Sequence, residues 1–475
     1  MKPKLNILPA CLRHNRQPYL YWMENLELPN QPQPIRRDPP AETATAVGAR
    51  VPGPADRAPR TGSLLAEGLI GSPILKIAAE VRALAAQGAQ ICNLTVGDFA
   101  PSEFPVPDLL SRELAAAVRH GETNYPPSTG MPGLRKAIME FCERRLGLKA
   151  QSDGLLVAAG ARPLIYGIYR VLVDPGERVV FPVPSWNNSY YCQLSGAIGV
   201  PMACDASTGF LPTAAMLRGK LRDARLLVLN SPVNPTGTVI GRDQLAEICD
   251  AVLEENARRA GLDRPLYLMY DQVYWMLTFG VEHVHPVALR PAMAAFTIYV
   301  DGISKSFAAT GLRVGWGVGP ASVMRPMSDL LTHVGAWAPR PEQVATTALL
   351  GDDKAIDEYQ RHMRGEVLQR LQALHDGIVS LKAHGFPVDA AIPSGAIYLS
   401  ARFHLHGKRA GAATLRTDDD VRSYLLRAAG LAAVPFSAFG QAEGSGWFRL
   451  SVGAVSMTDI QSLLPRLRVA VAALS

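Results

Sequence analysis

The chain has 475 residues, of which 48% are hydrophobic and 19% are charged, and its formal net charge is +6. This length predicts two domains, and the composition is typical of a globular enzyme without a membrane span, since no run of about 18 uncharged apolar residues occurs. The six cysteines form no CxxC pair, which favours reduced thiols in a cytoplasmic protein over a disulfide framework or a metal site.

Residues 1–62 differ in composition from the rest of the chain. They contain eleven prolines and no sustained periodicity, which predicts a disordered tail. They also hold nine Lys/Arg against five Asp/Glu, an excess of four, so most of the net charge lies in the tail. Because the remaining body is nearly neutral, no nucleic-acid partner is expected.

The folded body is expected to begin near residue 72, with a helix over 74–85 and a short strand over 91–96. From about 110 to 320, strand and helix patterns alternate, which predicts a mainly parallel sheet with right-handed crossovers. The strand candidates are 155–159, 179–182, 197–202, 226–230, 266–271, 296–301 and 314–318. Apolar residues from 356 to 381 recur every three or four positions and predict a long helix leading into a smaller C-terminal domain.

Chemically useful side chains cluster where these strands end. Lys305 lies among small residues, and an amine there can condense with an aldehyde once burial and nearby cations lower its pKa. Arg313 follows eight positions later and offers the planar donors that suit phosphate. Asn234 lies in an Asn-Pro-Thr-Gly turn, and Asp271 ends an apolar strand three residues before Tyr274. Ligands of open parallel sheets bind beyond such strand ends.

Together these motifs resemble the fold type I pyridoxal-phosphate enzymes, most closely the aspartate-aminotransferase-like class I/II aminotransferases, over roughly residues 70–475. The resemblance implies a three-layer α/β/α large domain with a mainly parallel sheet, and a smaller α+β C-terminal domain. The implied divisions are a tail (1–62), a segment packing with the small domain (63–109), a large cofactor domain (110–350) and a small domain (351–475).

The same resemblance implies a homodimer that uses pyridoxal 5′-phosphate to move an amino group between an L-amino acid and a 2-oxo acid. Lys305 would carry the cofactor and move the proton, Asp271 would bind the pyridine nitrogen, and Tyr274 would bind the phenolic oxygen. The other implied cofactor contacts are Gly160, Ala161, Arg162, Trp186, Asn234, Ser304, Arg313 and, across the dimer interface, Tyr125. The implied substrate contacts are Gly97, Asn234, Arg449 and Arg162.

Arg162 decides the expected substrate. Some bacterial aspartate aminotransferases carry a lysine at its position that binds the distal carboxylate, so aspartate or glutamate is favoured, and a role of Arg162 as a cofactor or interface ligand stays open. Two departures from the family pattern stand out. Gly302 replaces a phosphate-binding serine of some relatives, and Pro-Phe-Ser over 435–437 replaces the usual Pro-Gly.

Three alternatives remain open on the sequence. A β-lyase or a ring-closing synthase would use the same scaffold, and motifs barely separate these enzymes from transaminases. A cofactor-dependent regulator would need a basic DNA-binding module at the N-terminus, which the irregular, proline-rich residues 1–62 do not resemble.

Two His-x-His pairs, 283/285 and 404/406, lack a third candidate ligand nearby and are interpreted as structural.

Overall fold

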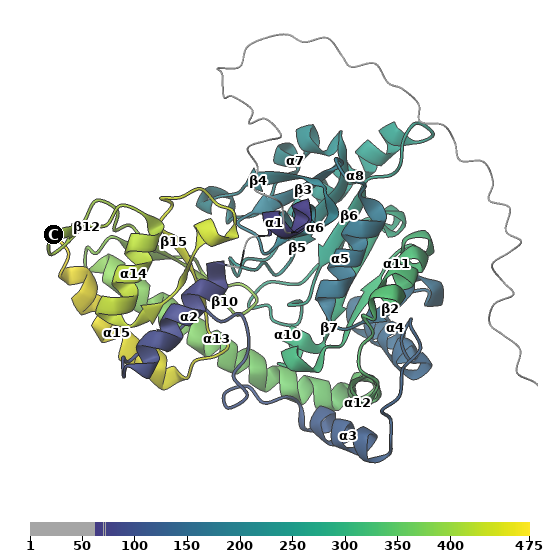
Figure 1. The fold of residues 1–475 in the computed structure, drawn as a ribbon, viewed down its shortest axis with the longest axis horizontal. Helices are drawn as coiled ribbons and strands as arrows, with labels where there is room; N and C mark the ends of the chain where they lie inside the picture. Colours follow the sequence, from purple (N-terminus) through teal and green to yellow (C-terminus); the bar gives the residue numbers. More distant parts are fainter. Residues whose placement is uncertain (1–61, 70, 72) are drawn as a thin grey trace, which may run out of the picture. The chain divides into compact units, whose positions relative to one another are not determined.

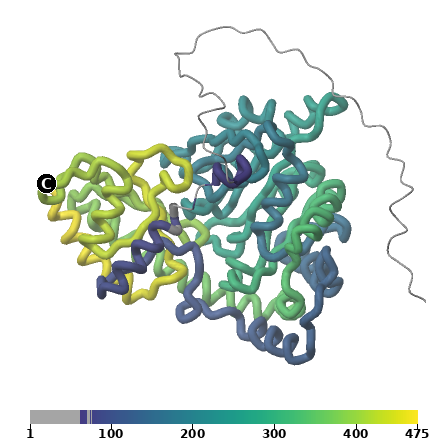
Figure 2. Tube along the Cα trace, in the orientation of Figure 1, coloured from purple at the N-terminus to yellow at the C-terminus, as the bar shows by residue number. Residues whose placement is uncertain are grey.

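The computed structural model describes residues 62–69, 71 and 73–475, so the tail expected over 1–62 lies outside the described residues apart from Gly62 (Figures 1 and 2). A seven-stranded sheet in the order β2-β8-β7-β6-β5-β3-β4 organises the larger part of this unit. Its strands are β2 (Leu155–Ala158), β3 (Arg178–Val183), β4 (Ile198–Ala203), β5 (Ala224–Asn230), β6 (Tyr267–Asp271), β7 (Thr297–Gly302) and β8 (Gly315–Val318). Each strand predicted between 155 and 318 is therefore confirmed, with ends shifted by one or two residues.

The sheet is mainly parallel, as predicted. β4, β3, β5, β6 and β7 pair in parallel, whereas β8 pairs antiparallel with both β7 and β2. Parallel strands need crossover connections, and helices supply most of them here. The consequence for function is geometric, because the carboxyl ends of β5, β6 and β7 open at the same edge of the sheet.

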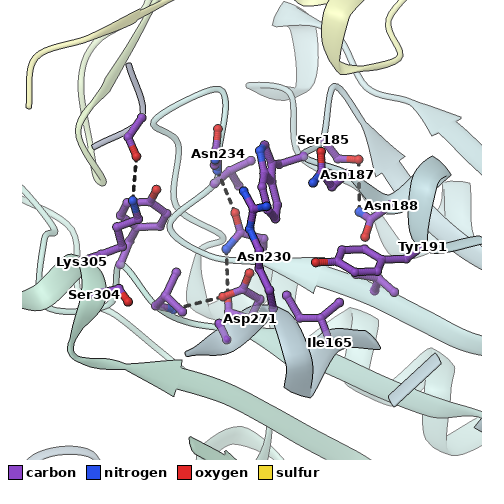
Figure 3. A pocket seen from close by; sticks show the side chains of 18 of the residues that line it. Ile165, Ser185, Asn187, Asn188, Tyr191, Asn230, Asn234, Asp271, Ser304 and Lys305 are labelled. Carbon is purple, nitrogen blue, oxygen red and sulfur yellow. Dashed lines mark hydrogen bonds between the residues drawn. The ribbon is translucent and has the colours of Figure 1, made fainter. Parts of the chain in front are cut away.

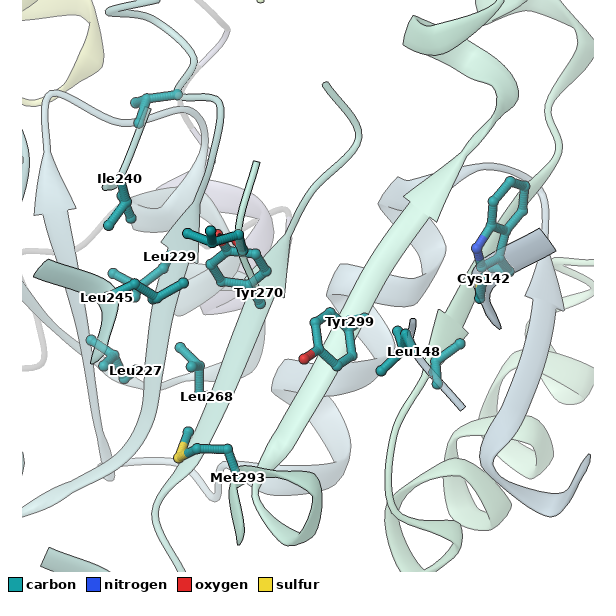
Figure 4. Packing of buried hydrophobic residues seen from close by; sticks show 14 of the residues in the cluster. Cys142, Leu148, Leu227, Leu229, Ile240, Leu245, Leu268, Tyr270, Met293 and Tyr299 are labelled. Atoms are coloured by element: carbon teal, nitrogen blue, oxygen red, sulfur yellow. The ribbon is translucent and has the colours of Figure 1, made fainter. Parts of the chain in front are cut away.

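Helices cover both faces of this sheet. On β5, Leu227 and Leu229 pack into one apolar cluster, whereas Leu226 and Val228 pack into another on the opposite face. Figure 4 shows the first cluster, in which β5 and β6 side chains meet Ile240 and Leu245. The helices lining that cluster include α4 (Pro132–Leu146), α7 (Ala214–Leu221), α8 (Arg242–Arg259) and α12 (Arg340–Leu350). The other face is covered by α5 (Ala161–Leu172), α6 (Asn188–Ser195) and α11 (Ala321–Val334).

One long helix, α13 (Asp353–Ala383), leads from this layered part into the C-terminal part, as the periodicity over 356–381 predicts. The C-terminal part is built on an antiparallel sheet in the order β14-β15-β10-β9. Its strands are β9 (Val388–Ala390), β10 (Tyr398–Phe403), β14 (Val434–Pro435) and β15 (Trp447–Ser451), and its helices are α14 (Asp418–Ala429) and α15 (Met457–Ala472). Apolar residues of α13, β10, β15 and both helices share one buried cluster.

The N-terminal segment contacts the C-terminal part. The predicted helix is present as α2 (Pro73–Ala86), whose Ile77 and Val81 pack against Val434 and Phe436. The strand predicted over 91–96 is shorter, because only β1 (Cys92–Asn93) pairs, in parallel with β13 (Leu431–Ala432). The chain then turns, since the Asn93 side chain accepts hydrogen bonds from the backbone and hydroxyl of Thr95.

The remaining elements are short or peripheral. They are α1 (Leu64–Gly68), α3 (Asp108–Arg119), α9 (Pro286–Leu289), α10 (Ile303–Ser306), β11 (Arg409–Ala410) and β12 (Ala413–Thr414). Within the described part of the chain, no helix is both long and apolar enough to cross a membrane.

Candidate active site

A cavity of about 830 Å³ opens at the carboxyl ends of β5 and β6. Figure 3 shows side chains converging on it from several elements, among them Asn230 at the end of β5, Asp271 at the end of β6, and Lys305 on α10. Of the predicted site residues, it collects Gly97, Ala161, Arg162, Trp186, Asn234, Asp271, Tyr274, Ser304, Lys305, Arg313 and Arg449. Gly160 and Tyr125 do not line it.

Lys305 presents a half-buried amine to the cavity. It lies on α10, the single helical turn that follows β7, and its Nζ donates a hydrogen bond of 2.6 Å to the Gly97 carbonyl. Burial lowers the pKa of Lys305 to about 8, and neighbouring guanidinium groups act in the same direction, against the opposing charge of Asp98. About a tenth of this amine is therefore unprotonated, and nucleophilic, at pH 7, far more than for a lysine with its usual pKa.

Asp271 is the half-buried acid of the site. Its Oδ1 accepts a backbone hydrogen bond of 3.2 Å from Val273, and no Lys, Arg or His side chain in the described residues pairs with it. Burial raises the pKa of Asp271 to about 6, while the Val273 N–H and the charge of Lys305 oppose that rise. A buried carboxylate without a cationic partner is costly, so this position suits a ligand that brings a positively charged N–H.

Arg313 and the start of α5 form an anion-binding corner. The Arg313 guanidinium donates to the Thr310 and Ala159 carbonyls at 2.7 and 2.9 Å, which places it beside Gly160. A Cβ on Gly160 would clash with the Arg313 guanidinium and push it aside, and the φ of +84° at Gly160 itself favours glycine there. The first N–H groups of α5 have no partner within the helix, and with the guanidinium they suit a phosphate.

Arg449 is a second cation facing the cavity, and only 2% of it is exposed. Its Nη1 and Nη2 donate to Asn234 Oδ1 (3.1 Å) and to the Thr95 carbonyl (2.6 Å), whereas its buried Nε has no acceptor. The guanidinium is held between the rings of Tyr398 and Phe439, at 4.8 and 4.9 Å. A buried guanidinium without an acid is a binding site for a carboxylate.

Arg162, in the first turn of α5, is the third cation. Its guanidinium lies 4.6 Å from the centre of the Trp186 ring, and it forms no ion pair or side-chain hydrogen bond with any described residue. Neither Arg313 nor Arg449 pairs with an acid in the described part of the chain. The cavity therefore offers three guanidinium groups that are available to anionic groups of ligands.

Neither Ser304 nor Tyr125 makes a hydrogen bond among the described residues that would assign it a role in the cavity. Ser304 lines the cavity, and its hydroxyl has no hydrogen-bond partner among the described residues. The side chain of Tyr125 lies on the surface, 83% exposed, and stacks on Trp337 with ring centroids 5.5 Å apart. Within one chain, Tyr125 therefore takes no part in this cavity.

The two departures from the family pattern have packing explanations. A Cβ on Gly302 would lie 2.7 Å from the Val314 carbonyl oxygen and 2.9 Å from the Gly315 Cα, so the β7–β8 pairing leaves no room for a serine. Phe436 is fully buried, and its ring contacts Phe210 and Trp447. The extra aromatic residue thus helps to anchor the loop that carries Phe439.

One histidine of each pair has a polar contact, whereas both ring nitrogens of His283 are buried without a hydrogen-bond partner among the described residues. His285 bonds to the Tyr299 hydroxyl and to the Leu146 carbonyl, and His406 lies 3.1 Å from Asp418. Residues 62–69, 71 and 73–475 contain no group of three or more histidine, cysteine or acidic residues arranged to hold a metal ion.

Sequence reasoning missed two residues that line the site, Tyr398 and Asp98. Tyr398 on β10 lines the cavity, and its hydroxyl lies 2.6 Å from that of Tyr274. Asp98 also lines it, with Oδ1 accepting from the Thr310 hydroxyl at 2.6 Å. A polar residue directly after Gly97 was a usable signal for Asp98. An aromatic residue within an apolar strand gives no such signal, so Tyr398 needed the structure.

Comparison with known proteins gives concordant matches. The model of the family "Aminotransferase class I and II" matches residues 89–467. An aspartate aminotransferase of Rhizobium meliloti (strain 1021) is 30% identical over 414 residues, which cover 84% of this chain and 93% of that protein. The crystal structure of the aspartate aminotransferase from Rhizobium meliloti superposes with a TM-score of 0.79 at 28% identity, covering 88% of this chain and 100% of that one. The Thermus thermophilus aspartate aminotransferase with maleate gives a TM-score of 0.77 at 26% identity, over 86% of this chain and 100% of that one.

Proposed function

The chain belongs to the class I and II aminotransferases, which use pyridoxal 5′-phosphate, and from this premise we propose that its cavity transfers amino groups of dicarboxylic amino acids, aspartate or glutamate, to 2-oxo acids. The observation that carries the substrate preference is the set of three guanidinium groups without acid partners, Arg162, Arg313 and Arg449. One matches the cofactor phosphate, and the other two match the two carboxylates of the substrate.

The residues present fit the cofactor. Arg313 and the start of α5 would hold its phosphate, next to the glycine that leaves room for the guanidinium. Asp271 would hold the pyridinium N–H, which supplies the positive charge that this half-buried carboxylate lacks. When bound, the protonated ring withdraws the electron pair that forms at the substrate α-carbon.

Three further side chains would fix the ring. Tyr274 and Asn234 present polar groups to the cavity where the phenolic oxygen would lie, and Trp186 presents an aromatic face for stacking. Lys305 would be the point of covalent attachment, since its amine has a pKa lowered to about 8 by burial. Once released by the substrate, the same amine would take the α-proton and return it at a neighbouring position.

Arg449 would bind the α-carboxylate. It is rigidly held by two hydrogen bonds and two aromatic rings, and its buried Nε still lacks an acceptor. Arg162 would bind the distal carboxylate, because it lines the same cavity and has no acid partner. The Thermus thermophilus relative with maleate was solved with a dicarboxylate, which is consistent with this reading of the two guanidinium groups.

The test begins with the purified holoenzyme. Borohydride reduction followed by peptide mapping should place a phosphopyridoxyl group on Lys305, and a label on another lysine would overturn the site. Single-turnover spectra against a panel of amino acids should then show the fastest reaction with aspartate or glutamate. Formation of the matching 2-oxo acid with retention of the amino group on the enzyme separates transamination from β-elimination and from ring closure, both of which expel a leaving group.

The assembly we propose is a homodimer, in the cytoplasm. Tyr125, which is 83% exposed beside Trp337, would reach the cofactor phosphate of a second subunit. An exposed aromatic ring stacked on a half-buried one is costly on a monomer and useful at an interface. The cytoplasmic assignment rests on the five described cysteines, which are all buried free thiols.

A further inference from the structure

The hydroxyls of Tyr274 and Tyr398 form a buried pair at the boundary between the two parts of the fold. Tyr274 follows β6 and Tyr398 begins β10, and their oxygens lie 2.6 Å apart. Both side chains are almost completely buried, with ring centroids 5.6 Å apart at an interplanar angle of 70°. At this distance one hydroxyl must donate to the other, so only one of the two protons remains available for a ligand.

Tyr398 also contacts Arg449 through its ring. The guanidinium carbon of Arg449 lies 4.8 Å from the Tyr398 ring centre, with Phe439 on the other side at 4.9 Å. The backbone of Gly97 closes the arrangement, because a Cβ on Gly97 would lie 2.9 Å from the Tyr398 hydroxyl and 3.5 Å from Arg449 Nη1. Tyr398 is therefore fixed by its neighbours and touches two groups of the site.

The direction of the hydroxyl hydrogen bond follows from what each group can donate or accept. Among the described residues, each of the two hydroxyls has the other as its hydrogen-bond partner. An ionised phenolic oxygen can only accept, so a Tyr274 hydroxyl that donates to the cofactor must itself accept from Tyr398. Burial raises the pKa of both hydroxyls, so both keep their protons near neutral pH.

We propose that Tyr398 is a positioning residue with two separable roles: its hydroxyl donates to Tyr274 so that the Tyr274 O–H points at the cofactor's phenolic oxygen, and its ring holds Arg449 in place for the substrate α-carboxylate. The proposal rests on the proposed function, in which Tyr274 and Arg449 contact cofactor and substrate. It adds a residue of the C-terminal part that acts on the chemistry only through these two side chains.

The first experiment isolates the hydroxyl. In holoenzymes of the wild type, Tyr274→Phe, Tyr398→Phe and the double variant, the pH midpoint of the bound cofactor's visible absorbance is titrated. A donor stabilises the phenolic oxygen as an anion, so Tyr274→Phe should raise the midpoint, and Tyr398→Phe should raise it by a smaller amount. The double variant should match Tyr274→Phe alone, because Tyr398 acts through Tyr274.

Several results would overturn this role of the hydroxyl. They are an unchanged midpoint in Tyr398→Phe, shifts that simply add in the double variant, or an unchanged midpoint in Tyr274→Phe. A wild-type protein without a lysine-linked absorbance band would instead refute the proposed function. Tyr424→Phe is the matched control, because it also removes a tyrosine hydroxyl bond in the C-terminal part, to the Ala470 carbonyl, away from the cavity. It should leave the midpoint unchanged.

The second experiment isolates the ring. α-Methylaspartate carries both carboxylates but no α-proton, so its dissociation constant reports binding without the proton-transfer step. Tyr398→Phe keeps a ring over Arg449 and should change this constant by less than about threefold, whereas Tyr398→Leu should weaken binding by about 3–30-fold. Equal affinities in the Phe and Leu variants would overturn this role.

Discussion

The pKa values of Lys305 and Asp271 are shifted by burial more than by ion pairing. Lys305 and Asp271 both lie at the carboxyl edge of the large sheet, without an opposite charge in hydrogen-bond contact. Burial moves each toward its neutral form, lowering the pKa of Lys305 to about 8 and raising that of Asp271 to about 6. Both groups are thereby poised for a ligand that supplies an aldehyde and a charged N–H.

The pH dependence of cofactor attachment follows from the state of Lys305. Only the unprotonated amine attacks an aldehyde, so the rate at which the cofactor-free protein takes up pyridoxal phosphate should rise with pH to a midpoint near 8, well below the usual value for lysine. Asp98 favours the protonated amine, so Asp98→Asn should move the midpoint to lower pH. Stopped-flow absorbance measures both, and a midpoint near 10 would contradict the assignment.

Asp271→Asn should separate activity from stability. The variant should lower kcat by about two orders of magnitude or more, because the pyridinium loses its anionic partner. Since the pKa of Asp271 is raised in the folded state, its ionised form destabilises the cofactor-free protein above pH 6 and not below about pH 4. At pH 7.5 the cofactor-free variant should therefore melt no lower than the wild type. Calorimetry beside steady-state kinetics tests this, and near-normal turnover would refute the role.

Arg162→Ala tests the dicarboxylate preference. Arg162 is exposed in the described chain, and a guanidinium–carboxylate pair from which the bound substrate excludes water contributes about 1.5–3 kcal/mol, so kcat/KM for aspartate and glutamate should fall by about one to two orders of magnitude. The value for alanine should change little, because alanine has no distal carboxylate. A uniform loss across substrates would place Arg162 on the phosphate instead, and a wild-type preference for aromatic or neutral amino acids would contradict the proposal directly.

At the scale of elements, strands were easier to predict than the contacts between them. The strands of the large sheet read as short apolar runs, and three of them, β5, β6 and β7, end in Asn230, Asp271 and Gly302, so both the sheet and its functional edge followed from local pattern. The strand over 91–96 was predicted too long, because its termination depends on the Asn93 side chain. The Tyr274–Tyr398 pair joins the turn after β6 to strand β10 of the other sheet, and no periodicity encodes such a contact.

The turn between β2 and α5 gives a prediction at this scale. A Cβ at residue 160 would displace the Arg313 guanidinium, so Gly160→Ala should weaken pyridoxal phosphate binding by at least about tenfold. Gly176→Ala is the matched control, because Gly176 has a similar φ of +86° and nothing within 4 Å of its added Cβ. Fluorescence titration of the cofactor-free proteins compares the two, and equal losses of affinity would show that only backbone strain matters.

At the scale of the whole molecule, the site combines distant parts of one chain and, we propose, parts of two chains. Arg449 and Tyr398 come from the C-terminal sheet, whereas Lys305 and Asp271 come from the large sheet. The sequence identified Arg449 as a lone arginine in an apolar strand but not its aromatic supports, which are set by packing. Tyr125 remains a prediction, because its role requires a second subunit.

Hybrid dimers test that role. In a dimer of one Tyr125→Phe subunit and one Lys305→Ala subunit, a tyrosine acting across the interface leaves one site with neither substitution. Random exchange of equal amounts should then restore about a quarter of wild-type activity, since half the dimers are hybrids with one intact site of two. A tyrosine acting within its own subunit would leave the mixture at the mean of the two parents. Native mass spectrometry verifies the exchange, and Tyr424→Phe mixed with Lys305→Ala sets the level expected for a hydroxyl outside the site.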